Sequence, residues 1–248
     1  MKPEITFLFP VHNEAETVET VISEFYGEVG SKIPSKMLVV EDGSIDGTKE
    51  ILAKLSQKIP MTLIMDDQRK GYSKAIIDGL EKVNTEYVFL TDSDGQHFAK
   101  DFWALYGYKD KCDILSGCRV KRADPLHRKI MSKTFQIMVK LLFGMSTLQD
   151  ITAPYRLMRS DVAQSIAREC KFMKESFWTE LTIRAHQKGY TIREIPISHR
   201  TRIGEGSTRV YLPTKIPKIV MAHLVGLSKL WLELKRHQPM PFKREENR

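Results

Sequence analysis

The sequence predicts an α/β fold: an open, mostly parallel sheet flanked by helices and followed by an amphipathic C-terminal helix. Short apolar runs alternate with segments of helical spacing, which implies strands joined by parallel crossovers. Polar motifs directly follow the apolar runs, at the sheet edge where open α/β folds bind their ligands. Hydrophobic residues make up 42% of the chain and charged residues 28%, so a sizeable core is expected.

The predicted strands and helices alternate regularly in the first half of the chain and less regularly in the second. Six short apolar runs are the predicted strands: Ile5–Phe9, Met37–Val40, Thr62–Met65, Tyr87–Leu90, Ile114–Gly117 and Thr191–Ile195. Six segments with helical spacing are the predicted helices: Glu14–Tyr26, the segment after Asp46, Ser73–Val83, Arg128–Met145, Trp178–Lys188 and a last helix, introduced by Pro213 and Pro217, that ends near Arg236. We therefore expect one main domain over residues 1–212, and an interface helix with a charged tail over residues 213–248.

The 248 residues carry a net charge of +8, which favours anionic partners such as phosphate-rich ligands or an anionic membrane surface. Nucleic acid is not expected as a partner, because the sequence has no helix-turn-helix, aromatic platform or zinc pattern. The three cysteines have no disulfide or metal spacing, and free thiols in a reducing compartment are expected. No signal peptide is visible, and no uncharged run reaches the ~18–20 residues of a membrane span. The expected location is therefore cytoplasmic.

An acidic cluster follows the apolar run Tyr87–Leu90. Asp92 and Asp94 are two residues apart and can point the same way, and Gln96 adds a further oxygen. Such hard oxygen ligands suit Mg²⁺ or Mn²⁺. The alternative is an Asp-rich turn that is held by its own hydrogen bonds.

The order of these motifs resembles a family 2 glycosyltransferase with the GT-A (nucleotide-diphospho-sugar transferase) fold, most closely the dolichyl- and polyprenyl-phosphate sugar synthases. In that family an Asp-x-Asp-x-Gln-His motif holds a divalent metal against the donor diphosphate, and Asp92-Ser93-Asp94-Gly95-Gln96-His97 has every element of it. The resemblance covers about Ile5 to Arg209. It implies a metal site at Asp92, Asp94 and Gln96.

Three further motifs follow predicted strands in the family's order: Pro10-Val11-His12-Asn13-Glu14, Glu41-Asp42-Gly43-Ser44 and Lys70-Gly71-Tyr72-Ser73-Lys74. The resemblance implies that these motifs and the acidic cluster bind the nucleotide. The implied nucleotide-binding residues are Pro10, His12, Asn13, Glu14, Asp42, Ser44, Gly71, Lys74, Asp92 and Ser93. Asn13 also has a simpler interpretation as the N-cap of the next helix.

Arginines in the second half match positions that contact phosphate in the family. The implied catalytic residues are Asp92, Asp94, Arg119 and Arg202, and the implied acceptor-phosphate residues are Arg119, Arg200, Arg202, Ser207 and Arg209. Arginine forks suit phosphate oxygens. In the stretch from Asp150 to Arg156, Ala153-Pro154 departs from the family's small residue and glycine, which puts the local backbone and acceptor specificity in question.

A missing carboxylate points to the acceptor. Family 2 enzymes that glycosylate a hydroxyl carry Glu-Asp before a helix, and this chain has Phe177 and Trp178 there. A hydroxyl needs a base, whereas a phosphate monoester, with a second pKa of about 6, is already anionic at neutral pH. The substitution favours a lipid-phosphate acceptor, although Glu175 or Glu180 remains an alternative base.

Two helices have apolar stripes with basic edges. One stripe runs from Ile130 to Met145, and the other runs from Ile216 to Leu234 and includes Trp231. The apolar core Ile219–Leu232 spans roughly 21 Å, short of the ~30 Å of a bilayer, so the helix is expected to lie in the membrane interface. The alternative is packing against the sheet or against a second subunit in a homo-oligomer.

The predicted function is inverting, metal-dependent transfer of a sugar from a nucleoside-diphosphate sugar to a polyprenyl phosphate, at the inner face of the cell membrane. One alternative is a family 2 transferase that acts on a sugar or lipid hydroxyl. The other is a non-catalytic nucleotide-sugar-binding protein at the membrane, which would keep its role after Asp94→Ala.

Overall fold

The computed structural model describes residues 3–121, 123, 126–203 and 216–236. Within them, one sheet has the strand order β3-β2-β1-β4-β6-β5-β7. The strands are β1 (Ile5–Val11), β2 (Ser35–Asp42), β3 (Thr62–Asp66), β4 (Tyr87–Leu90), β5 (Ile114–Arg119), β6 (Arg156–Arg159) and β7 (Ile192–Ile197). Only the pairs that include β6 are antiparallel, so the predicted open, mostly parallel sheet is confirmed.

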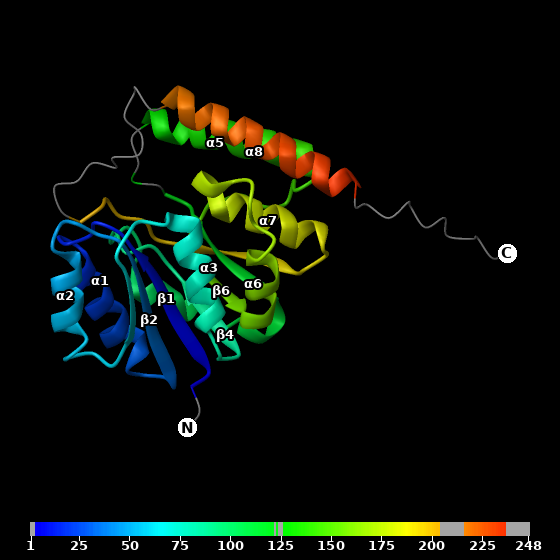
Figure 1. The fold of residues 1–248 in the computed structure, drawn as a ribbon. Helices are drawn as coiled ribbons and strands as arrows, with labels where there is room; N and C mark the ends of the chain where they lie inside the picture. The colour runs from blue at the N-terminus through cyan, green and yellow to red at the C-terminus, as the bar shows by residue number, and fades with distance from the viewer. Residues whose placement is uncertain (1–2, 122, 124–125, 204–215, 237–248) are drawn as a thin grey trace.

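Eight α-helices connect and cover the described strands (Figure 1). They are α1 (Val18–Phe25), α2 (Thr48–Leu55), α3 (Tyr72–Lys82), α4 (Phe102–Tyr106), α5 (Leu126–Phe143), α6 (Ser160–Ala167), α7 (Phe177–Gln187) and α8 (Ile216–Arg236). The sequence analysis missed β6, α4 and α6. Strand β6 was missed because its four residues, Arg-Leu-Met-Arg, alternate in no recognisable pattern.

The side chains of each strand divide between two cores. In β1, Ile5, Phe7 and Phe9 pack on the side of α1, α2 and α4. Leu8 packs on the other side, among side chains of α3, α6 and α7. Because successive side chains of a strand point to opposite faces, this split makes three layers, with the sheet between two sets of helices.

The chain changes direction at β1. It moves from β1 to β2 and β3 on one side, and then returns to place β4 on the other side of β1. The carboxyl ends of β1, β2 and β4 therefore lie next to one another at one edge of the sheet. Ligands of open α/β folds bind at such a reversal of strand order.

Helices α5 and α8 form a further layer across one end of the sheet (Figure 1). They run side by side in the same direction, since Phe135 contacts His223 near their middle and Phe143 lies with Trp231 near their ends. The inward residues, among them Val139, Leu227 and Leu230, form a third buried cluster. The predicted stripes are partly wrong: Phe135, Met138 and Met145 pack inward with this cluster.

No helix of the described residues is both long and apolar enough to cross a membrane. The predicted boundary between residues 212 and 213 and the charged tail from Gln238 lie outside the described residues. The two-part domain division stays a prediction.

Candidate active site

The loops after β1 and β2 are held together by side chains that the sequence assigned to the nucleotide. The His12 ring donates from Nδ1 to the carbonyl oxygen of Asp42 at 2.7 Å. The backbone amide of Asn13 donates to Ser44 Oγ at 2.8 Å, and the backbone amide of Ile45 donates to the side-chain oxygen Oδ1 of Asn13 at 2.9 Å. These contacts make one rigid rim at the edge of the sheet.

Asn13 is not a helix N-cap. Its φ is +54°, in the left-handed region, and α1 begins only at Val18. The backbone amides of Glu14 and Ala15, which lie between Asn13 and α1, donate to side chains that follow β2, Thr48 Oγ1 and Asp46 Oδ2. The predicted helix start at Glu14 was therefore wrong by four residues.

Asp42 clamps the third loop. It is 2% exposed, and its two carboxylate oxygens accept the amides of Lys70 at 2.6 Å and Gly71 at 2.8 Å. Gly71 has φ +100°, which a residue with a Cβ rarely adopts, just before α3. Asp42 and Gly71 thus fix the loop; their contact with a nucleoside stays a prediction.

The acidic motif alternates between two faces. Asp92, Asp94 and Gln96 are half-buried, whereas Ser93 and His97 are buried at 3% exposure each. Ser93 Oγ donates to the carbonyl oxygen of Pro10 at 3.0 Å, so its side chain braces β1 and does not face the same side as the carboxylates. The three predicted metal ligands are thus the partly exposed members of the motif.

The carboxylates of this site repel one another. Burial raises the pKa of Asp92 to about 7, and the charge of Asp94 adds to the effect. Burial also raises the pKa values of Asp94 and Glu14, while the charge of Arg202 opposes both shifts. Among the described residues no group of three or more His, Cys, Asp or Glu side chains is arranged to hold a metal ion. Two mutually repelling carboxylates with an amide nevertheless fit a divalent ion whose remaining ligands are water and diphosphate oxygens.

Because the pKa of Asp92 is higher in the folded state than its ordinary 3.8, this carboxyl group binds more protons in the folded protein than in the unfolded chain between about pH 4 and pH 7. The contribution of this group to stability must fall as pH rises through that window. We expect metal-free Asp92→Asn to match wild type near pH 4 and to exceed it above pH 7 by about 1–2 kcal/mol, or roughly 2–8 °C in Tm. Thermal melts with a chelator check this, and a gap that does not widen with pH would contradict it.

The segment before residue 204 lies against the acidic motif. The Arg200 amide donates to the Gln96 carbonyl oxygen at 3.0 Å, and Ile203 occupies the space beside Gly95. The Arg200 guanidinium pairs with Glu24 at 2.6 Å and stacks over Phe98, whereas Arg202 pairs with Glu14. Arg202 thus stands beside the acidic cluster, and Arg200 ties the segment to α1. Ser207 and Arg209 lie outside the described residues.

Arg119 ends β5 and is 9% exposed. Its Nε and Nη2 bind both oxygens of Asp150 at 2.7 and 2.8 Å, and Nη2 also reaches Thr152 at 2.9 Å. Burial raises the pKa values of Asp92 and Asp94, and the charge of Arg119 opposes both rises. The positive charge of Arg119 therefore acts on the carboxylates of the site, while its guanidinium is bound to Asp150. The predicted contact of Arg119 with phosphate stays a prediction.

Of the two alternative bases, Glu180 is engaged in structural contacts. Glu180 is 1% exposed and accepts the backbone amides of Lys171, Phe172 and Met173 at 2.7–3.0 Å, and it also pairs with Arg184. Glu175 is exposed on the turn before α7. A buried carboxylate that already holds three amides and a guanidinium is structural.

Three residues near the acidic motif were missed. Tyr72 donates to Asp92 Oδ1 at 2.5 Å, and Trp178 Nε1 donates to Tyr72 at 2.7 Å. Burial raises the pKa of Asp94, and the charge of Arg128, in the first turn of α5, is among those that oppose the rise. No spacing in the sequence links them, because they come from three different helices. Lys74 points along α3 to Asp78.

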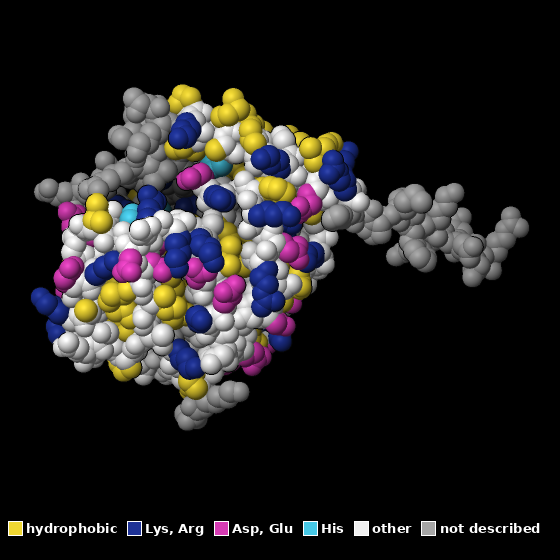
Figure 2. Space-filling view, in the orientation of Figure 1, with side chains coloured by type: hydrophobic (Ala, Val, Ile, Leu, Met, Phe, Trp, Pro, Cys, Tyr) yellow, Lys and Arg dark blue, Asp and Glu magenta, His cyan; other side chains and the backbone are white. Residues whose placement is uncertain are grey.

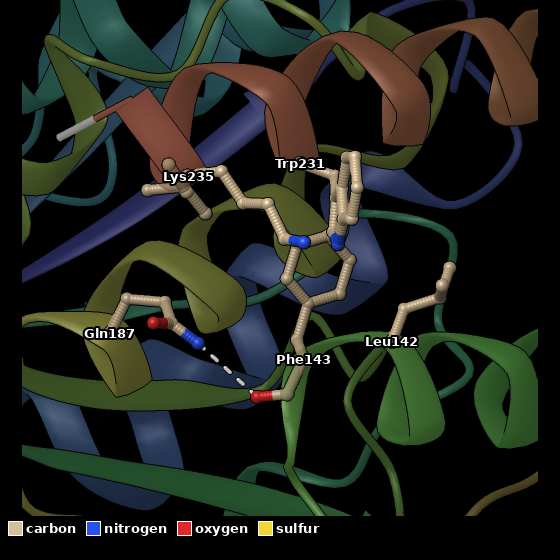
Figure 3. Close-up of a pocket in the computed structure, with 6 residues that line it drawn as sticks. Leu142, Phe143, Gln187, Trp231 and Lys235 are labelled. Carbon is tan, nitrogen blue, oxygen red and sulfur yellow. Dashed lines mark hydrogen bonds between the residues drawn. The ribbon is translucent and has the colours of Figure 1, made fainter. Parts of the chain in front are cut away.

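A small cavity lies away from this motif, between the carboxyl ends of α5, α7 and α8 (Figure 3). It is lined by Leu142, Phe143, Gln187, Trp231, Leu234 and Lys235. Its volume of about 160 Å³ is below the roughly 300–1,000 Å³ of small-molecule sites, so we do not assign the donor to it. The Lys235 ammonium lies 4.0 Å from the centre of the Trp231 ring, one turn further along α8.

A three-layer fold with an acidic motif at its strand reversal defines a glycosyltransferase of GT-A fold. The sequence profile of glycosyl transferase family 2 matches residues 6–167, and the chain belongs to this family. The predicted fold and family are thereby confirmed.

Two relatives are similar along most of the matched region. The chain is 29% identical over 208 residues to the polyprenol monophosphomannose synthase of Mycolicibacterium smegmatis, covering 79% of this chain and 77% of that protein. It is 27% identical over 172 residues to the dolichol-phosphate mannosyltransferase of Pyrococcus furiosus, covering 66% of this chain and 48% of that protein. The predicted likeness to polyprenyl-phosphate sugar synthases is confirmed.

Two solved structures share the fold. Glucosyl-3-phosphoglycerate synthase of Mycobacterium tuberculosis, solved with Mn²⁺, uridine diphosphate and phosphoglyceric acid, superposes with a TM-score of 0.72 at 16% identity, covering 96% of this chain and 80% of that one. Mannosyl-3-phosphoglycerate synthase of Rubrobacter xylanophilus gives 0.65 at 12% identity, covering 98% and 78%. At these identities the likeness concerns the fold.

Proposed function

We propose that this glycosyltransferase transfers a mannosyl-type sugar from a nucleoside diphosphate to a polyprenyl phosphate, with inversion and with Mg²⁺ or Mn²⁺ as cofactor. The carrying observation is the site: paired carboxylates at the strand reversal, arginines beside them, and a buried aromatic pair where a hydroxyl acceptor would need a base. The names of the two relatives support the sugar and the acceptor.

The leaving group is a diphosphate, whose negative charge must be neutralised for the bond to break. Asp94 and Gln96, aided by Asp92, would hold the divalent ion, which supplies charge neutralisation when bound. The rim of His12, Asn13 and Ser44 would orient the nucleoside. Such positioning, together with fixed charge, supplies most of the rate when the acceptor displaces the diphosphate directly, without a covalent intermediate on the enzyme.

The acceptor needs charge complementarity and no base. Arg202 and Arg119 place positive charge beside Asp94, and Arg128 adds to it. A phosphate monoester that arrives there is already an anionic nucleophile. Phe177 and Trp178 are 2% and 6% exposed and cannot accept a proton, which supports a phosphate acceptor over a hydroxyl.

The outer face of the α5–α8 layer supports a membrane-borne acceptor. Ten of the fourteen exposed large hydrophobic side chains of the described residues lie there: Leu126, Ile130, Ile137, Leu141, Leu142, Val220, Met221, Leu224, Val225 and Leu232. Figure 2 shows hydrophobic side chains with Lys and Arg beside them along this edge. Apolar faces with basic borders suit an anionic lipid surface. Since Arg128 lies in the first turns of α5, this face begins close to the acidic motif.

We expect Leu141→Glu combined with Leu224→Glu to weaken binding to anionic vesicles at least about 10-fold. Both positions would lie in the apolar part of the membrane interface, where a glutamate is costly. They are 80% and 42% exposed, so the Tm should change by less than about 2 °C. Met65→Glu, at an exposed position on β3, is the control. Vesicle sedimentation measures the effect, and unchanged binding of the double variant would contradict this surface.

The function is tested by a donor panel. The protein is incubated with GDP-mannose, UDP-glucose or other nucleotide sugars, polyprenyl phosphate, and Mg²⁺ or Mn²⁺. We expect a lipid-linked sugar phosphodiester that forms only with metal present. A product glycosylated on a hydroxyl would favour the alternative acceptor, and the absence of product from a folded protein with every donor would overturn the proposal.

A further inference from the structure

Asp92 is held by a chain of two hydrogen bonds that starts inside the protein. The indole Nε1–H of Trp178, in the first turn of α7, donates to the Tyr72 hydroxyl at 2.7 Å. Tyr72, at the start of α3, donates to Asp92 Oδ1 at 2.5 Å. Three elements that are far apart in sequence therefore meet at one carboxylate oxygen.

The direction of this chain is fixed by its donors. An indole N–H can only donate a hydrogen bond, so the Tyr72 oxygen must be the acceptor of the bond from Trp178. The Tyr72 proton is then directed to the remaining partner, which is Asp92 Oδ1. Oδ1 of Asp92 is thereby engaged, whereas Oδ2 accepts no hydrogen bond from the residues that the structure describes.

The inner end of the chain is immobilised by buried charge. The Arg156 guanidinium lies 5.1 Å from the centre of the Trp178 ring and has 0% exposure. Arg156 is itself held by the carbonyl oxygens of Ile151 and Ala153 at 3.0 and 2.9 Å. Phe177 contacts the tryptophan ring at an interplanar angle of 80°. An indole held in this way has little freedom to turn its N–H away.

We propose that Tyr72 and Trp178 are positioning residues that hold Asp92 in the orientation in which it receives the donor's metal–diphosphate group. The proposal rests on the proposed function, since it assigns these two side chains to the same site. Partners that orient metal-binding carboxylates commonly contribute 10- to 100-fold to metal affinity, so about 10-fold is expected here.

The test compares two tyrosines that make the same kind of bond. Tyr72→Phe removes the hydroxyl from Asp92, and Tyr87→Phe removes a hydroxyl that donates to Asp110 at 2.8 Å in another part of the molecule. Mn²⁺ is titrated into each full-length protein by electron paramagnetic resonance, with GDP and separately with UDP present. Tyr72→Phe should weaken Mn²⁺ binding about 10-fold, and Tyr87→Phe should change it less than 2-fold.

Trp178→Phe is the second variant, because it keeps the Tyr72–Asp92 bond and replaces the indole with a smaller aromatic ring that has no N–H to donate. We expect it to weaken Mn²⁺ binding about 3-fold, between wild type and Tyr72→Phe. Wild-type affinity in Tyr72→Phe and in Trp178→Phe would overturn the positioning role alone. A wild-type protein that binds no Mn²⁺ with either nucleotide would overturn the metal-dependent function and the positioning role with it.

Discussion

Asp94→Asn should lower kcat/KM for sugar transfer by about 10³-fold or more while the protein stays folded. Asp94 is the carboxylate whose neighbourhood contains the charges of Arg119, Arg128 and Arg202. The amide keeps the shape of the side chain and removes the charge that would hold the divalent ion. Losing several kcal/mol of charge stabilisation at the departing diphosphate corresponds to a rate loss of this size.

The matched control is Asp161→Asn, an aspartate on α6 whose side chain is 74% exposed and faces Arg159 at 3.6 Å. It should leave kcat/KM within about 2-fold of wild type. Initial rates at saturating metal, with melting curves for both variants, make the measurement. If Asp94→Asn retained more than a tenth of wild-type activity, the metal-dependent mechanism would be wrong.

Glu180→Ala should lower the free energy of unfolding by about 3–5 kcal/mol, or roughly 6–20 °C in Tm. The substitution leaves three backbone amides without their acceptor and removes the buried partner of Arg184. Among the residues that the structure describes, Arg184 would keep only its ion pairs with Glu233 at 3.0 Å and Glu169 at 3.7 Å. Buried amides that are left without an acceptor are among the most costly defects in a fold. Denaturant or thermal unfolding measures the loss.

Glu175→Ala is the companion variant, because Glu175 is exposed on the turn that leads into α7. It should change stability by less than about 0.5 kcal/mol and leave transfer intact. Full activity of Glu175→Ala excludes Glu175 as the base. A loss of 10²-fold or more in that folded variant would show that this chain uses a base after all, and would favour a hydroxyl acceptor.

Local pattern was sufficient for the strands that are buried on both faces. Phe7, Phe9 and Leu8 of β1 form a continuous apolar run because both faces of the strand are covered, and such runs are visible without any structure. The acidic motif was visible for a related reason, since polar residues directly after a buried strand stand out. Strand β6 was not visible, because its Arg156 is buried by contacts with carbonyl groups that only the fold assembles.

The amphipathic helices show the limit of a one-dimensional pattern. A helix that packs on one side and exposes apolar side chains on the other has no polar face to mark its orientation. The stripe predicted from Ile130 to Met145 includes Phe135, Met138 and Leu141, yet the first two pack inward and Leu141 is 80% exposed. Which apolar residues are covered depends on where α8 lies against α5.

The sequence alone determined six of the seven strands and the edge at which Asp92 and Asp94 stand, because strand periodicity and strand-end polarity are local properties. The order of its motifs indicated the family. Only the tertiary structure decided what each polar side chain does. It turned Ser93 inward, engaged Arg119 with Asp150, tied Glu180 to three amides, and placed Tyr72 and Trp178 behind Asp92. Hydrogen-bond partners are chosen by proximity in space, and spacing along the chain carries no record of that proximity.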